Sequence, residues 1–174
     1  MDTLRSLLEQ PPATVPVELR SVGPVRALAI AEQVPASDLD SWWEAAYGEL
    51  DAVLAAAGVP AGGTRAALYP AEFFELGAGE VVAYVPVARN VSDGGGRVRP
   101  REIPGAELAV AVHRGGLADI DRTYGALGTY VAGREIGVAG PIRERYLVTA
   151  FDTDDESRHV TEVCWPVFRT GSST

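Results

Sequence analysis

The chain has 174 residues, of which 47% are apolar and 22% charged, a globular composition long enough for one domain with its own core. A formal net charge of −9 argues against a nucleic-acid partner, because a phosphate-binding surface needs a basic patch, and no apolar run approaches the roughly 20 residues of a membrane span. A single cysteine, Cys164, excludes a disulfide framework, and His113 and His159 lie in unrelated segments, so we expect no metal and no cofactor.

Residues 1–16 are expected to form an N-terminal tail. They lack the basic start and apolar run of a signal peptide, and with no membrane segment the expected location is the cytoplasm. They are also too few for a DNA-binding domain, so we expect no transcription-factor activity in this chain. Residues 17–174 are expected to form one domain.

The first half of this domain is predicted to contain a strand, a helix and two strands. The run VRALAIAEQV is rich in β-formers and predicts the first strand. Ser37 and Asp40 form a capping-box pattern, an apolar stripe over residues 39–57 predicts a helix, and Gly58 is a stop signal. The segments that follow are a strand TRAALY, a loop PAEFFELGAG and a strand EVVAYVPV.

The second half repeats this pattern. It comprises a strand ELAVAVHR, a helix over Leu117 to Arg134, a strand PIRERYLV, an acidic loop DTDDES and a strand HVTEVCWPV. LAIA echoes LAVA, AYGEL echoes TYGAL, Tyr69 corresponds to Tyr146, and VPV echoes WPV, always 77 or 80 residues later. Four echoes in one order favour two homologous modules, residues 17–87 and 101–167, joined by a Gly-rich linker, residues 88–100.

The predicted fold class is therefore α+β, with duplicated strand-helix-strand-strand modules. Strands linked by hairpins imply antiparallel sheets, and each sheet carries one helix on one face. Two modules side by side can oppose their open faces, and we expect a ligand cleft between the two halves.

Two carboxylates occur only in the second copy. Glu144 corresponds to Ala67 and Glu162 to Val82, so acidic side chains replace apolar ones on two strands expected to be neighbours. A buried carboxylate is costly unless it is paired, so these glutamates are either a pocket floor or solvated residues paired with nearby arginines. Matching residues such as Tyr47 and Tyr124 are interpreted as fold positions.

Four segments of the second half carry a family pattern: HRGG, TYGAL, GPIRERY and TEVCWPV. In this order they resemble the GyrI-like small-molecule-binding domain, the effector-binding half of several multidrug-responsive regulators, which also occurs in stand-alone proteins. The resemblance extends from Val17, because that family is itself a duplicated module.

The resemblance implies a cleft for flat, apolar, often cationic compounds, with a glutamate in its floor and aromatic side chains around it. The motifs place Glu144, Tyr146 and Glu162 in this cleft. The aromatic residues proposed as its walls are Tyr69, Phe73, Phe74, Tyr84, Trp165 and Trp42; Trp42 and Trp43 alternatively belong to the core. Cation–π attraction adds to the pull of a desolvated carboxylate on a cation.

The leading interpretation is a stand-alone, polyspecific binder of amphipathic or cationic aromatic molecules. The alternative is a hydrolase of reactive electrophiles such as cyclopropane-containing natural products, with Glu144, Tyr146 and Glu162 as the catalytic groups. A third is a protein-interaction role such as gyrase inhibition. The oligomeric state is open, and a monomer is plausible.

Overall fold

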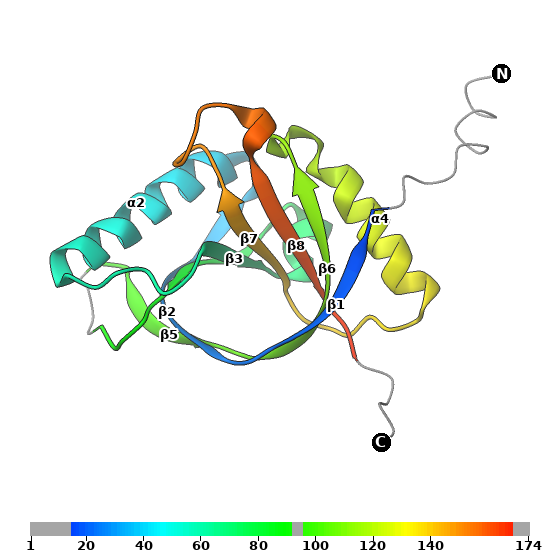
Figure 1. Ribbon diagram of the computed structural model, residues 1–174, viewed down its shortest axis with the longest axis horizontal. Helices are drawn as coiled ribbons and strands as arrows, with labels where there is room; N and C mark the ends of the chain where they lie inside the picture. The colour runs from blue at the N-terminus through cyan, green and yellow to red at the C-terminus, as the bar shows by residue number, and fades with distance from the viewer. Residues whose placement is uncertain (1–14, 92–95, 169–174) are drawn as a thin grey trace.

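A computed structural model describes residues 15–91 and 96–168 of the chain. Within these residues the fold is α+β, with one eight-stranded sheet and helices packed against it (Figure 1). Every strand pair is antiparallel. The predicted fold class and the predicted antiparallel pairing are therefore confirmed.

The strands are β1 (Val17–Val22), β2 (Val25–Pro35), β3 (Arg65–Tyr69), β4 (Ala78–Pro86), β5 (Arg99–Ile103), β6 (Ala106–Arg114), β7 (Ile142–Val148) and β8 (Val160–Pro166). The α-helices are α2 (Leu39–Ala57), α3 (Ala71–Leu76) and α4 (Ile120–Gly133), and 3₁₀ turns occupy η1 (Ala36–Asp38), η2 (Leu117–Asp119) and η3 (Glu156–Arg158). The strand order across the sheet is β1-β6-β8-β7-β3-β4-β2-β5.

The two long helices form close to where the apolar periodicity places them. α2 ends at Gly58, whose φ of 65° is the left-handed conformation that glycine adopts without strain. Ser37 does not cap α2, because the turn η1 precedes the helix and no side chain caps its N-terminus. The expected loop PAEFFELGAG contains α3, a six-residue helix too short to show a period, which is anchored by buried Phe73.

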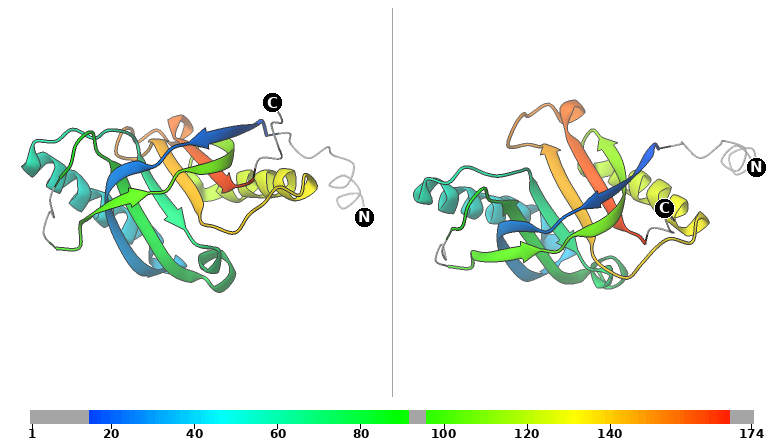
Figure 2. Two further views of the ribbon diagram at one scale, coloured as in Figure 1. Left: turned by 90° about the horizontal axis from the view of Figure 1, so that it is seen from below. Right: turned by 60° about the horizontal axis from the view of Figure 1, so that its bottom comes forward.

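Two long bent strands close the sheet on itself. β1 and β2 are separated only by residues 23–24, and β5 and β6 only by residues 104–105. Val22 pairs with Ala106 and Val25 with Ile103, so one register continues through both bends, and the two strands run side by side in the views of Figure 2. At this crossing a Cβ on Gly105 would lie 2.8 Å from the carbonyl oxygen of Val22, so only glycine fits.

The arrangement of the halves differs from the expected one. The two halves do not form two sheets with opposed open faces; β3 pairs with β7, and the halves share one sheet. β5 begins inside the expected linker and pairs with β2, so the end of that segment is part of the sheet. The origin of the two halves by duplication stays a prediction.

Both faces of the sheet are apolar over much of their area. α2 packs on β2 and β4, α4 packs on β6 and β8, and both helices lie on the same face (Figure 1). The opposite face is lined by two smaller clusters, one around Leu68 and Tyr84 and one around Leu108 and Cys164. The side chains of β7 therefore alternate between a helix-covered face and a face closed by the bent strands.

Candidate ligand-binding cavity

A cavity of about 400 Å³ lies on the helix-covered face, where β3 meets β7. It lies between the N-terminal part of α2 and the start of α4, and the loop after β7 completes its wall. The lining residues are Leu39, Asp40, Trp43, Glu44, Tyr69, Leu117, Ile120, Glu144, Tyr146, Ala150 and Phe151. Both halves of the chain contribute, as expected, but the cavity lies under the helices rather than between two open faces.

Glu144 lies in the floor of this cavity. Strand alternation turns Glu144 and Tyr146 to the helix side, whereas Arg143 and Arg145 point to the opposite face. Only 8% of Glu144 is exposed, so the expected burial is confirmed. Its partner on β3 is Ala67, the apolar residue that corresponds to it in the first half of the chain.

Three tyrosines surround the carboxylate. The Tyr146 hydroxyl donates to Oε1 of Glu144 at 2.8 Å, and the Tyr124 hydroxyl donates to Oε2. Tyr69 lies 2.6 Å from Tyr146, hydroxyl to hydroxyl, and since Tyr146 donates to Glu144, it accepts from Tyr69. The three phenols thus place two hydrogen-bond donors on a buried carboxylate without adding a formal charge.

The ionisation of these groups follows from burial. Desolvation raises the pKa of Glu144 above its ordinary value of 4.5, although the hydrogen bonds from Tyr124 and Tyr146 and the charge of nearby His113 oppose the shift. Desolvation, reinforced by the charge of Glu144, raises the pKa values of Tyr69, Tyr124 and Tyr146 well above 10. The phenols therefore stay protonated, and the carboxylate lacks the counter-charge that would restore its ordinary pKa.

Aromatic rings form one wall of the cavity. The Trp43 ring meets Tyr146 edge-on with centroids 5.2 Å apart and lies 5.3 Å from Phe151. Tyr47 packs behind Trp43, at 4.9 Å. The guanidinium of Arg65 lies over the Phe151 ring, 4.5 Å from its centroid. A flat apolar ligand can stack against these rings.

The charged residues of the lining are all acidic. Asp40 and Glu44 stand one helical turn apart on α2, on the same side as Trp43, and Glu144 lies in the floor. Among the described residues, no basic side chain lines the cavity or forms an ion pair with Glu144. The field inside the cavity therefore favours a cation.

Five of the sequence-predicted site residues lie in or beside the cavity. Glu144, Tyr146 and Tyr69 line it. Phe73 and Phe74 contact the Tyr69 ring, at 5.4 and 6.2 Å between centroids, and Phe74 also contacts Tyr124. They support the tyrosines without lining the cavity.

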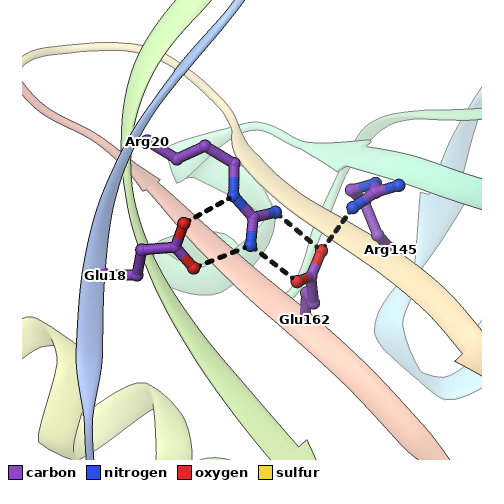
Figure 3. Close-up of polar contacts among 4 residues, drawn as sticks. All are labelled: Glu18, Arg20, Arg145 and Glu162. Carbon is purple, nitrogen blue, oxygen red and sulfur yellow. Dashed lines mark hydrogen bonds and ion pairs between the residues drawn. The ribbon is translucent and has the colours of Figure 1, made fainter.

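The prediction that Glu162 shares this cavity is wrong. In the register of β7 with β8, Glu144 pairs with Val163, and Glu162 pairs with Arg145, on the opposite face. There Glu162 accepts two hydrogen bonds from Arg20, both at 3.0 Å, and another from Arg145 (Figure 3). Burial alone would raise its pKa, but the hydrogen bonds and charges of Arg20 and Arg145 outweigh it and lower the pKa below 4.5.

Three predicted aromatic residues also lie elsewhere. Tyr84 is on the opposite face, because its partners in the ladder are Ala29 and Ala66. Trp165 packs against Gly128 of α4, 3.4 Å from a Cβ placed there. Trp42 donates a hydrogen bond to Glu32 of β2, beside the core. The tryptophan that lines the cavity is its neighbour Trp43.

Several residues that line the cavity or contact Glu144 were missed by sequence reasoning. Tyr124 was interpreted as a fold position, yet it donates to Glu144. Asp40, Trp43 and Glu44 carried a usable signal, since their spacing puts them on one side of a helix, but the side facing a cavity was not distinguishable from the core. Phe151 comes from an irregular loop and carried no periodic signal.

Neither metal binding nor a membrane span finds support in the described residues. No group of three or more His, Cys, Asp and Glu side chains in this part of the chain is arranged to hold a metal ion. Over residues 15–91 and 96–168, no helix combines the length and apolar character needed to cross a membrane.

A family model, the GyrI-like small molecule binding domain, matches residues 16–167. No curated protein sequence matches the chain. Among solved structures, the C-terminal domain of EcmrR has a TM-score of 0.79 at 19% identity, covering 90% of this chain and 99% of that domain. EcmrR in a complex with DNA has a TM-score of 0.81 at 18% identity and covers 97% of this chain, which spans only 63% of that EcmrR chain.

Two further solved structures share the fold. SAV2435 bound to tetraphenylphosphonium has a TM-score of 0.64 at 13% identity, and the match covers 88% of this chain and 94% of the SAV2435 chain. A hydrolase encoded by lin2189 from Listeria innocua has a TM-score of 0.64 at 12% identity, and the match covers 96% of this chain and 98% of the hydrolase chain. At these identities the similarity shows a common fold.

Proposed function

The chain belongs to the GyrI-like small-molecule-binding domain family, and we propose that its ligands are bulky aromatic cations held in the cavity over Glu144. The observation that carries this proposal is the carboxylate of Glu144, which is 8% exposed, accepts hydrogen bonds from two phenols and forms no ion pair with a described residue. A bound cation would supply the missing counter-charge in a place where water screens it poorly.

The other lining residues favour the same ligands. Asp40 and Glu44 add negative potential at the entrance, and the rings of Trp43 and Phe151 offer faces for stacking. Apolar contacts are not directional, and only one buried charge has to be matched. The cavity therefore suits a range of amphipathic cations rather than one compound, which is the polyspecific behaviour that we propose.

The comparison with SAV2435 supports this ligand class. That protein has the same fold and was solved with tetraphenylphosphonium, a cation with four phenyl rings. Its identity to this chain is 13%, so the likeness supplies a candidate probe and the residues around Glu144 supply the reason to use it.

The experiment compares two probes of nearly the same shape and opposite charge, tetraphenylphosphonium and tetraphenylborate, by isothermal titration calorimetry. We expect the chain to bind the cation and to reject the anion. Glu144→Gln should weaken binding of the cation by about 5- to 150-fold, because it removes the buried charge and keeps the volume.

Glu80→Gln is the matched control, since it removes one charge from an exposed residue of β4 outside the cavity lining. It should leave the affinity within about twofold, because exposed charges are screened by salt. Equal affinity of the two probes for the unaltered chain, or equal losses in the two variants, would contradict the proposal.

Hydrolysis of electrophilic compounds is a second candidate, supported by the fold shared with the lin2189 hydrolase and by the groups around the cavity. Glu144 has a raised pKa suited to a general base, and Tyr146 and Tyr124 are protonated hydrogen-bond donors beside it. Glu162 is removed from the catalytic set, because it lies on the other face. Product formation from a cyclopropane-containing alkylating agent, lost in Glu144→Gln while binding persists, would establish this activity.

A further inference from the structure

A second cavity lies on the face of the sheet away from the helices. It measures about 260 Å³ and is bounded by the bend between β5 and β6 and by the segment leading into β7. Its apolar walls include Leu68, Leu108, Val138, Pro141 and Pro166. A neighbouring hollow of about 380 Å³ shares Leu68, Gly140 and Pro141 with it, so the two are contiguous.

Arg143 is the buried charge of this cavity. It follows from the alternation of β7 that Arg143 faces away from Glu144, and its ladder partners Leu68 and Cys164 lie on the same face. Only 8% of Arg143 is exposed. The guanidinium borders an apolar space of its own, on the reverse of the strand that carries the carboxylate.

The hydrogen bonds of Arg143 are incomplete. Nη2 donates to the carbonyl oxygen of Pro104 at 3.0 Å, and Nε is buried without any partner. In the described part of the chain, Arg143 forms no ion pair with a carboxylate. A guanidinium has five N–H donors, so a single hydrogen bond to Pro104 leaves the Nη groups able to donate to a ligand as well.

The neighbouring arginines on this face, unlike Arg143, have a carboxylate partner. Arg20 and Arg145 both donate to Glu162 (Figure 3), which leaves Arg143 as the basic side chain lining the second cavity. The other charged residue in the lining is Glu107, whose Oε1 accepts from the Ser21 hydroxyl at the edge of the sheet. A buried cation without a counter-ion is unfavourable, and an anionic ligand would remove that penalty.

We propose that this second cavity is a binding site for small organic carboxylates with an apolar body. The carboxylate accepts hydrogen bonds from the Nη atoms of Arg143, a geometry for which a guanidinium is well suited, and the hydrocarbon part packs on Leu68, Leu108 and Pro166. This site lies on the opposite face of the sheet from the Glu144 cavity, has a different lining and takes a ligand of the opposite charge.

The test is a ¹H–¹⁵N NMR titration of the full chain with benzoate and octanoate, each paired with its neutral amide, benzamide and octanamide. We expect at least one carboxylate to shift the amide signals of Leu68, Leu108 and Arg143, and to bind about tenfold more tightly than its amide. Saturating tetraphenylphosphonium should not displace it, because that cation has the other face as its site.

Arg143→Met should lower the carboxylate affinity by about tenfold or more, because it removes the charge and most of the donors and keeps an apolar side chain. Arg122→Met is the matched control: Arg122 is exposed on α4, and its loss changes the net charge equally. If Arg143→Met does not fold, the comparison of carboxylate with amide on the unaltered chain decides alone. No shift with either carboxylate, equal binding of the amides, or shifts centred on Tyr69 and Glu144 would overturn the proposal.

Discussion

Two buried glutamates on opposite faces of one sheet show how a neighbouring charge changes what a carboxylate does. Glu144 and Glu162 are 8% and 6% exposed, on adjacent strands. Glu144 accepts hydrogen bonds only from phenols and has a raised pKa, whereas Glu162 accepts hydrogen bonds from two arginines and has a lowered pKa. The exposed fractions are similar, but Glu144 lies deeper in the protein than Glu162, so the difference in pKa arises from the stronger desolvation of Glu144 together with the arginine partners of Glu162.

The comparison separates a stabilising carboxylate from one available to a ligand. Glu162 joins β1, β7 and β8 through Arg20 and Arg145, and its charge is already matched (Figure 3). Glu144 has an unmatched charge beside an open cavity, which favours binding and lowers stability. Substitution of the two residues should therefore change the free energy of unfolding in opposite directions.

The largest effect is expected from Glu162→Gln. It leaves Arg20 and Arg145 without their anion, and because both arginines are partly exposed, we expect a loss of about 2 kcal/mol rather than the full penalty for a buried pair. Urea denaturation at neutral pH measures this change. An unchanged unfolding free energy would mean that the network contributes nothing.

The pH dependence of stability gives a second measurement of the interaction of Glu162 with its two arginines. Because the folded-state pKa of Glu162 is lowered, its stabilisation is present above about 4.5 and is lost as pH falls through the folded pKa. Glu162→Gln should therefore lose less stability than the unaltered chain on acidification below about 4.5. Parallel curves for the two proteins would contradict the lowered pKa.

A smaller effect of opposite sign is expected from Glu144→Gln. The folded-state pKa of Glu144 is raised, so the unfolded chain releases this proton first, and stability falls as pH rises from about 4.5 to the folded pKa. Removing the group should therefore stabilise the ligand-free protein at neutral pH, by less than Glu162→Gln destabilises it. The same urea denaturation series measures this change. Destabilisation at neutral pH would mean that Glu144, like Glu162, stabilises the fold, and would contradict the account.

Tyr124→Phe tests how the phenol hydrogen bonds affect the pKa of Glu144. It removes one of the two hydrogen bonds to Glu144, so the pKa of Glu144 should rise further, and the pH midpoint of tetraphenylphosphonium binding should rise with it. At pH above this midpoint the affinity should stay within about fivefold of the unaltered chain. Calorimetric titrations across pH measure both, with Tyr130→Phe, near the C-terminal end of α4 and outside the cavity lining, as the control.

The smallest effect is expected from salt. Raising sodium chloride from about 50 to about 500 mM should weaken tetraphenylphosphonium binding by less than about threefold, since a buried ion pair is poorly screened. A steep loss of affinity would indicate that the exposed Asp40 and Glu44 attract the cation, rather than Glu144.

Local patterns predicted part of this site. Strand alternation within PIRERYLV was sufficient to put Glu144 and Tyr146 on one face, and the repeat with Tyr69 brought in the adjacent strand. The same alternation did not fix the pairing of β7 with β8. A shift of one residue in that register exchanges the faces, and this is why Glu162 was placed beside Glu144.

The remaining differences concern contacts between segments distant in the chain. The apolar stripe of α2 included both Trp42 and Trp43, and only the position of the helix on the sheet shows that Trp43 enters the cavity. Arg143 was not singled out from the sequence, and the crossing strands β1–β2 and β5–β6 bury it. Neither feature follows from spacing, because both depend on how the sheet curves.

The central claim is that the carboxylate of Glu144 is the counter-charge for a cationic ligand. It is tested most directly by following the ¹³C carboxyl signal of Glu144 through a pH titration, free and saturated with tetraphenylphosphonium, with Glu144→Gln to assign the signal. We expect a pKa above 4.5 in the free protein and a lower pKa in the complex, because the bound cation stabilises the ionised form. A pKa that is the same in both states would contradict the claim.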